Sequence, residues 1–142
     1  MDNKSGTLYI VATPIGNLND ITNRAIEILN KVDICAAEDT RQSLKLFNAY
    51  DITTKLTSYH KFSEKNKTII LIKELLSGKD IAIISDAGTP LISDPGRYLV
   101  NGAIEEGIEV VPIPGPTSVI AALSISGFNL DNFKHFGFLS RK

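Results

Sequence analysis

Apolar residues in this chain alternate between short β-rich runs and longer segments with helical spacing. The β-rich runs predict strands at 7–13, 33–37, 55–59, 80–85 and 109–113. Apolar positions that recur every three or four residues predict helices at 19–32, 40–50, 64–76, 95–106 and 117–125. Parallel strands need crossover connections, so this alternation predicts an α/β fold with a mainly parallel five-stranded sheet and helices on both faces.

Polar residues, glycines and prolines mark where several of these helices begin and end. Asn19 or Asp20 is expected to cap the first helix. Gly78 is expected to end the third. Pro95 fits the first position of the fourth helix, and Gly107 its end.

The last residues have an apolar pattern of their own. Phe133, Phe136 and Phe138 lie within 132–140 (NFKHFGFLS), which predicts the start of a further strand. One interpretation makes residues 1–131 an N-terminal α/β domain and 132–142 a linker, or the first strand of a C-terminal domain beyond this sequence. The alternative is a strand that closes the edge of the same sheet.

Composition narrows the class of protein further. With 142 residues, 43% hydrophobic and 22% charged, the chain fits one soluble globular domain. Its single cysteine, Cys35, rules out an internal disulfide and is expected to be buried, and no metal site is expected. No apolar run approaches the roughly 20 residues of a membrane span, so the chain is expected to be cytoplasmic with no membrane contact.

Charge is uneven along the chain although the net charge is only −1. Residues 41–73 hold seven Lys and Arg against two Asp and Glu, whereas residues 1–40 hold three against six. This basic segment is either a face for an anionic substrate or a solvated helix surface.

Three loops that follow predicted strands are rich in Gly, Pro and small polar residues: TPIGN at 13–17, SDAGTP at 85–90 and PGPTS at 114–118. Such loops form rigid pockets lined by backbone, and ligands bind at the carboxyl ends of strands in open α/β sheets. The phosphate-binding patterns GxxxxGK[ST] and GxGxxG are absent. Arg97 is the one cation near Asp86 and Asp94, so the loops suit a zwitterionic or cationic ligand better than a triphosphate.

The segments TPIGNL–DI, AAEDTR, SDAGTPLISDPG and PIPGPTS, in this order and spacing, resemble the tetrapyrrole-methylase superfamily of methyltransferases. Within it, the chain is most similar to the 16S rRNA ribose 2′-O-methyltransferase I family. The resemblance extends from Thr7 to Lys142. The porphyrin-methylating members usually read GGDP where this chain has 85–90, which favours the rRNA branch.

The resemblance implies a two-domain homodimeric enzyme, of which this chain supplies the first domain. It also implies S-adenosylmethionine as cofactor and 16S rRNA in the small ribosomal subunit as substrate. The residues implied in cofactor binding follow the first, fourth and fifth strands: Pro14, Ile84, Asp86, Thr89, Thr117 and Ser118.

Removing the proton of a ribose hydroxyl would assist methyl transfer, and Glu38, Asp39 and His60 are the candidate bases or orienting groups. Asp39 has a second interpretation as a helix cap, and His60 as an inert loop residue. Arg41 suits a phosphate, since its planar guanidinium matches phosphate geometry.

We expect Arg41, His60 and Lys61, with Lys65 and Lys67, to contact RNA. Tyr59 and Phe62 are either base-stacking residues or core residues. Two other functions remain open for the chain, a tetrapyrrole methylase and a non-catalytic nucleotide- or RNA-binding module.

Overall fold

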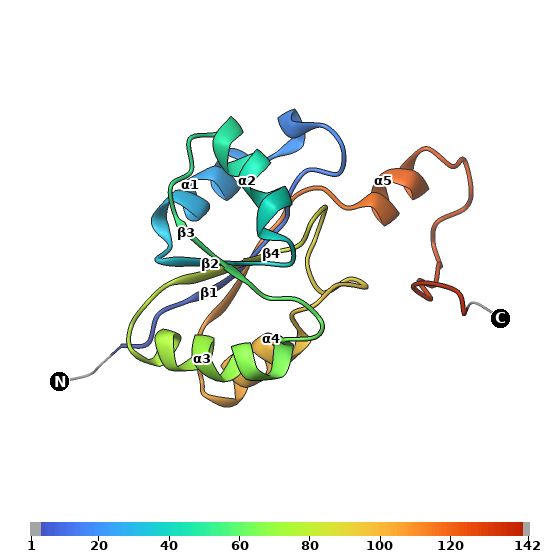
Figure 1. Cartoon of the computed structure of the whole chain (residues 1–142). Helices are drawn as coiled ribbons and strands as arrows, with labels where there is room; N and C mark the ends of the chain where they lie inside the picture. The colour runs from blue at the N-terminus through green and yellow to red at the C-terminus, as the bar shows by residue number, and fades with distance from the viewer. Residues whose placement is uncertain (1–3, 141–142) are drawn as a thin grey trace.

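A computed structural model describes residues 4–140 (Figure 1). Five short strands alternate with helices along the chain. The strands are β1 (Leu8–Val11), β2 (Ile34–Ala37), β3 (Lys55–Ser58), β4 (Ile81–Ile84) and β5 (Val110–Ile113). The helices are the 3₁₀ turn η1 (Leu18–Asp20), α1 (Asn23–Lys31), α2 (Thr40–Ala49), α3 (Glu64–Leu76), α4 (Arg97–Glu105) and α5 (Ser118–Ser124).

The five strands form one sheet in the order β3-β2-β4-β1-β5, and every pairing is parallel. This confirms the predicted α/β class. The two central strands, β4 and β1, pair in register from Leu8 opposite Ile81 to Ile10 opposite Ile83.

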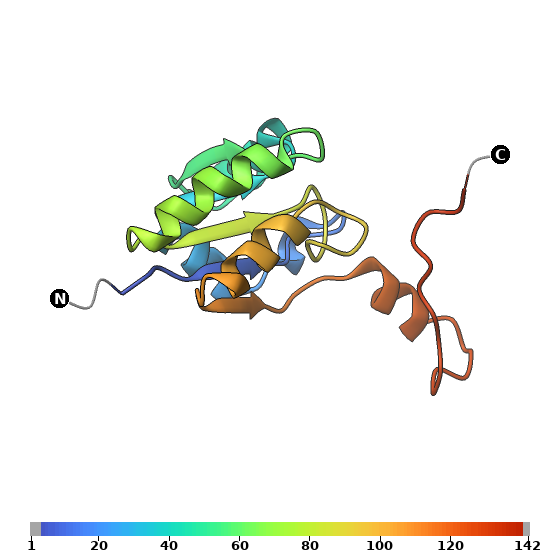
Figure 2. The same cartoon turned by 90° about the horizontal axis from the view of Figure 1, so that it is seen from below.

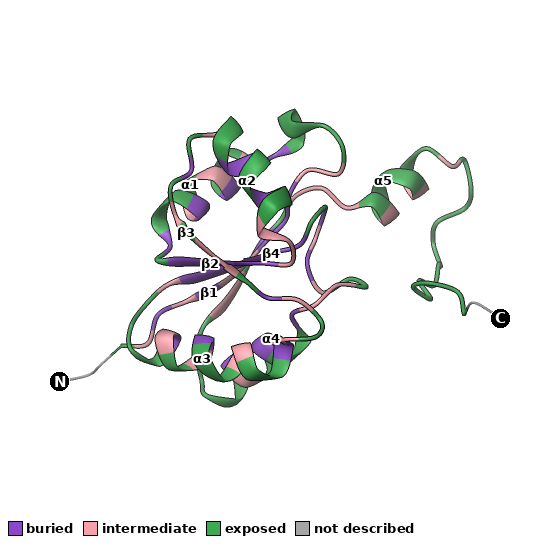
Figure 3. Ribbon diagram, viewed as in Figure 1, coloured by how far each residue is buried: buried purple, intermediate pink, exposed green. Residues whose placement is uncertain are grey.

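Helices cover both faces of the sheet, as predicted (Figure 1). Helices α1 and α2 pack on one face, where Leu29 and Phe47 contact a core that includes Ile84 of β4. Helices α3 and α4 pack on the other face with Ile83. Strand β4 is therefore buried on both sides, which explains why it reads as a continuous apolar run (Figure 3).

Two predicted helix starts were wrong by a few residues. Thr22 caps α1 by accepting a hydrogen bond from the N–H of Ala25 at 3.0 Å, whereas Asn19 and Asp20 lie in η1. Helix α4 begins at Arg97 after Gly96, so Pro95 precedes the helix. The predicted helix ends at Gly78 and Gly107 are confirmed, with φ angles of 96° and 67°.

The strand expected over 132–140 is not formed, since these residues have no regular secondary structure and are exposed. The sheet edges are β3 and β5, so no sixth strand closes the sheet within residues 4–140. Helix α5 buries no side chain, and it lies with the C-terminal segment beyond the carboxyl ends of the strands (Figures 1 and 2). Phe136 and Phe138 are 81% and 90% exposed.

Within residues 4–140, no helix is both long enough and apolar enough to cross a membrane.

Candidate functional site

The fold creates a crevice at the carboxyl ends of β1 and β4. These neighbouring strands lead to helices on opposite faces, β1 to α1 and β4 to α4. The loops that leave them diverge, which is the arrangement at which open α/β sheets bind ligands. This crevice between the ends of β1 and β4 is therefore where we expect the ligand site.

The three loops rich in glycine and proline are held to one another by hydrogen bonds. The N–H groups of Thr13 and Gly88 each donate to the other's carbonyl oxygen at 3.0 Å. The Thr89 hydroxyl donates to the carbonyl of Pro116 at 3.1 Å. Gly88 has a φ of +80°, and a Cβ there would lie 3.3 Å from Ile15 Cγ2. The loops therefore behave as one rigid unit, with glycine required at this crossing.

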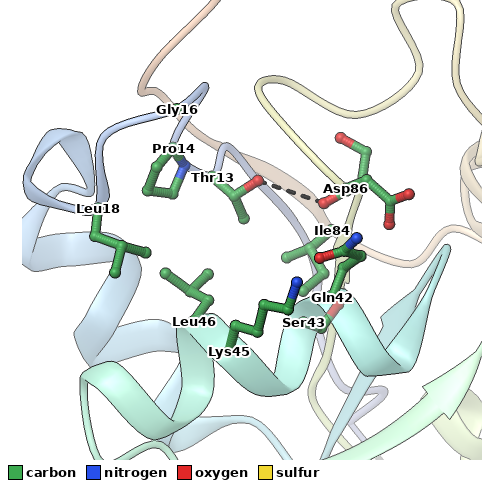
Figure 4. A pocket seen from close by; sticks show the side chains of 11 residues that line it. Thr13, Pro14, Gly16, Leu18, Gln42, Ser43, Lys45, Leu46, Ile84 and Asp86 are labelled. Carbon is green, nitrogen blue, oxygen red and sulfur yellow. Dashed lines mark hydrogen bonds between the residues drawn. The ribbon is translucent and has the colours of Figure 1, made fainter.

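A first pocket, of about 330 Å³, lies between the loop after β1 and helix α2 (Figure 4). We call it the β1–α2 pocket. Pro14, Ile84 and Asp86 line it, as do four residues of α2, Gln42, Ser43, Lys45 and Leu46. The Thr13 hydroxyl donates to the carbonyl of Ser85 at 3.4 Å and links the two strand ends beside it.

A second pocket, of about 290 Å³, lies between the loop after β4 and the start of α5. We call it the β4–α5 pocket. Thr89, Thr117 and Ser118 line it together with His135, Gly137 and Phe138 of the C-terminal segment. The six residues implied in cofactor binding thus divide equally between two pockets at the same edge of the sheet.

Three carboxylates influence one another electrostatically at this edge: Glu38 follows β2, and Asp86 and Asp94 lie in the loop between β4 and α4. Burial, followed by the charges of Asp86 and Asp94, raises the pKa of the Glu38 carboxyl. Burial and Asp86 raise the pKa of Asp94, partly offset by a hydrogen bond with Ser85. Asp86 Oδ1 also accepts a hydrogen bond from the backbone N–H of Asp39 at 3.1 Å. This concentration of negative charge favours a cationic ligand.

Asp39 and Arg41 form a pair of their own. Asp39 caps α2, because its Oδ1 accepts the N–H of Arg41 at 2.9 Å. The guanidinium of Arg41 donates to both carboxylate oxygens of Asp39, at 3.1 and 2.8 Å. These contacts lower the pKa of Asp39 to about 2. Such a carboxylate is a weak base, whereas the raised pKa of Glu38 brings it nearer to neutral pH.

The two aromatic residues considered for base stacking, Tyr59 and Phe62, differ in exposure. Tyr59 is 1% exposed and shares a 2.9 Å hydrogen bond with Thr68, so it is a core residue. Phe62 is 96% exposed and meets the His60 ring edge to face. The Nδ1 of His60 is buried and has no hydrogen-bond partner among the described residues.

Lys61 lines two further pockets. It lines one of about 230 Å³ with Glu38 and Asp94, which we call the acidic pocket. It also lines one of about 450 Å³ with Phe62 and Lys65, the basic corner. The complete linings are Glu38, Lys61, Glu64, Ser93, Asp94 and Pro95 for the acidic pocket and Lys61, Phe62, Glu64, Lys65, Asn66 and Tyr98 for the basic corner.

Sequence reasoning missed Lys45, Gln42 and Ser43 because they lie on a helix that follows the site rather than in a loop. Their spacing from the Asp39 cap places them on one face of α2, and that signal was available in the sequence. Glu64 was also missed. It is buried and accepts the N–H of Gly96, the N-cap residue of α4, at 2.8 Å, so a side chain of α3 binds the backbone where α4 begins.

Across residues 4–140, no group of three or more His, Cys, Asp and Glu side chains is arranged to hold a metal ion.

The chain is an α/β domain with a parallel sheet and pockets at the carboxyl ends of its strands. Residues 7–142 match the family model described as Tetrapyrrole (Corrin/Porphyrin) Methylases, and the chain belongs to this family. A solved uroporphyrin-III-C-methyltransferase from Thermus thermophilus shares the fold, with a TM-score of 0.66 and 24% identity over 89% of this chain and 55% of that one.

Closer relatives carry a more particular name. A "Ribosomal RNA small subunit methyltransferase I" of Halalkalibacterium halodurans is 54% identical over 96% of this chain, and one of Vibrio cholerae is 52% identical over 99%. These matches confirm the resemblance. The chain spans about half of these relatives, 47% and 49% of their own length.

Proposed function

We propose that this chain is the N-terminal domain of an S-adenosylmethionine-dependent methyltransferase that modifies a ribose 2′-hydroxyl of 16S rRNA. The observation that carries the proposal is sequence identity above 50%, over nearly the whole chain, to relatives named as small-subunit rRNA methyltransferases. The site adds independent support, because its rigid loops and clustered carboxylates suit a cationic ligand.

The residues at the strand ends fit S-adenosylmethionine. Asp86 is exposed at the β1–α2 pocket and would attract the sulfonium or the α-amino group. Pro14 and Ile84 offer apolar contacts in the same pocket. Thr89 and Ser118 offer hydroxyls in the β4–α5 pocket, together with Thr117. When bound, the cofactor supplies a methyl carbon already activated by the sulfonium.

Glu38 is the favoured general base. As the hydroxyl oxygen bonds to the methyl carbon and the carbon–sulfur bond breaks, Glu38 would accept the hydroxyl proton. Its raised pKa keeps the carboxylate more basic than an ordinary glutamate, whereas the pairing of Asp39 with Arg41 makes Asp39 unsuitable. Asp39 would instead hold Arg41 at the start of α2, where the exposed guanidinium can reach an RNA phosphate.

The remaining expectations concern the whole protein. We infer a second domain after residue 131, since the matched relatives are about twice as long. Exposed apolar side chains, among them Ile125, Phe128 and Phe136, suit contact with such a domain or with the second subunit of a homodimer. A ribosomal substrate places the enzyme in the cytoplasm.

Methyl transfer from tritiated S-adenosylmethionine to small ribosomal subunits, catalysed by the full-length protein, tests the proposal. Label is expected in 16S rRNA at a ribose, where the methylated position resists alkaline hydrolysis. Label in uroporphyrinogen and none in rRNA would move the protein to the tetrapyrrole-methylating branch. Tight binding of ATP without binding of S-adenosylmethionine would indicate a non-catalytic nucleotide-binding module.

A further inference from the structure

We propose that the basic corner, the pocket lined by Lys61, Phe62, Glu64, Lys65, Asn66 and Tyr98, stacks an unpaired base of single-stranded RNA. The inference rests on the proposed function, because it takes RNA to be the substrate. The basic corner would hold a nucleotide other than the one whose ribose is methylated.

Two aromatic side chains in this pocket are available to a ligand. Phe62 is 96% exposed, in the loop that precedes α3, and its ring meets His60 at a centroid distance of 6.2 Å and an interplanar angle of 62°. Tyr98 is 48% exposed on the first turn of α4. Exposing a phenylalanine ring to water is unfavourable. Stacking on the π-face of a base would bury such a ring.

Two lysines line the same pocket as the rings. The Lys65 ammonium lies 5.6 Å from the centroid of the Tyr98 ring, which keeps a positive charge over one aromatic face. Lys61, also exposed, contributes a second charge. The one carboxylate of the lining belongs to Glu64, whose Oε1 accepts the N–H of Gly96 at 2.8 Å, so the two lysines outnumber it. Aromatic rings beside free ammonium groups are the usual composition of sites for single-stranded nucleic acid.

The basic corner is continuous with the candidate catalytic edge. Lys61 and Glu64 line both the basic corner and the acidic pocket, and the acidic pocket also contains Glu38. Ser93 and Asp94 then line both the acidic pocket and the β4–α5 pocket. A strand held at the basic corner therefore has a continuous path to the proposed base and cofactor.

The test is the affinity of full-length protein for a single-stranded oligoribonucleotide that contains 2-aminopurine, whose fluorescence falls on stacking. Phe62→Ala is expected to weaken binding about 5- to 150-fold and to abolish the quenching. Tyr98→Ala is expected to act in the same direction, whereas Phe62→Tyr, which keeps a stacking ring, should retain affinity. Ile69→Ala is the matched control, since Ile69 is 58% exposed on α3 and lies outside this pocket.

Three results would overturn the base-stacking site. The first is no binding of the oligonucleotide by the wild-type protein. The second is an affinity for Phe62→Ala and Tyr98→Ala within twofold of the Ile69→Ala control. The third is a lower melting temperature for Phe62→Ala at unchanged RNA affinity, which would mean that Phe62 packs against another part of the protein. Methyl transfer by the wild-type protein is measured separately. If the wild-type protein transfers no methyl group but binds the oligonucleotide in a way that depends on Phe62, the proposed function is overturned and the stacking site is supported.

Discussion

Asp86 is the residue whose replacement tests the charge of the site most directly. Two neighbouring unit charges near a protein surface interact by about 4 kcal/mol at 4 Å, whereas fully exposed pairs contribute about 0.2–1 kcal/mol. Asp86 is exposed but lines a pocket, so we expect a loss between these limits, about 1–2 kcal/mol. Asp86→Asn should therefore weaken S-adenosylmethionine binding about 5- to 30-fold.

The choice of variant separates charge from hydrogen bonding. Asparagine keeps an oxygen that can accept the N–H of Asp39, whereas Asp86→Ala removes both the charge and the acceptor. Calorimetry on the full-length protein at low and high salt measures both effects, and the loss in Asp86→Asn should shrink as salt screens the charge. Asp51→Asn is the control, since Asp51 is exposed in the loop that enters β3, at the opposite end of the strands, and asparagine tolerates its φ of +51°.

Equal affinity of Asp86→Asn and the wild type, with weak binding by Asp86→Ala alone, would refute the electrostatic argument and leave Asp86 as a loop-positioning residue.

Three further predictions concern catalysis, RNA binding and the loops. Glu38→Gln should lower kcat about 10²- to 10⁴-fold, and unchanged kcat would exclude Glu38 as the base. Because burial and the negative charges of Asp86 and Asp94 raise the pKa of Glu38, the rising limb of the wild-type pH–rate profile should lie above that of an ordinary glutamate and should move to lower pH in Asp86→Asn. Arg41→Ala should raise KM for the ribosomal substrate more than KM for the cofactor, and Arg41→Lys should not restore it because lysine lacks the planar fork; an equal rise in both constants would indicate a structural role. Gly88→Ala and Gly107→Ala both force alanine into positive φ, so each should lower the free energy of unfolding by about 1–2 kcal/mol in chemical denaturation. Only the Gly88 variant, which also crowds Ile15, should weaken cofactor binding. Equal cofactor affinity in the two variants would contradict the proposed rigidity of the loops.

The strands were predictable because β4 and β2 are buried on both faces, so each reads as an unbroken apolar run. Helix starts were less predictable, since Thr22, Asn19 and Asp20 are all good caps. Packing selects among them: Ile21 is buried directly before the Thr22 cap, and Asn17 takes the capping role for η1.

The segment 132–140 shows a second reason why a structure could not be predicted from the sequence pattern. Its phenylalanines resemble an apolar strand, but a strand needs a hydrogen-bonding neighbour, and the chain leaves the sheet through α5 in the direction of the strand ends. Lys45 illustrates a third limit. Its spacing after Asp39 predicts the face of the helix on which it lies, yet the contact of that face with the β1–α2 pocket depends on how α2 packs against the loop after β1, which periodicity does not encode.

The acidic pocket and the basic corner differ in charge, and this difference separates the places where a cationic cofactor and an anionic RNA backbone are attracted. Glu38 and Asp94 lie in the acidic pocket, where burial and the nearby charge of Asp86 raise their pKa values. Lys65 lies in the basic corner next to it, and Lys61 lines the border between the two pockets. The three carboxylates attract a cationic cofactor to the neighbouring β1–α2 and β4–α5 pockets, whereas an RNA backbone is repelled from the acidic pocket and attracted to the basic corner. The part of the RNA that can enter the acidic region at least cost is a neutral group, and the ribose hydroxyl is such a group. The same charge distribution that recruits both ligands therefore also favours presenting the hydroxyl, rather than a phosphate, to Glu38.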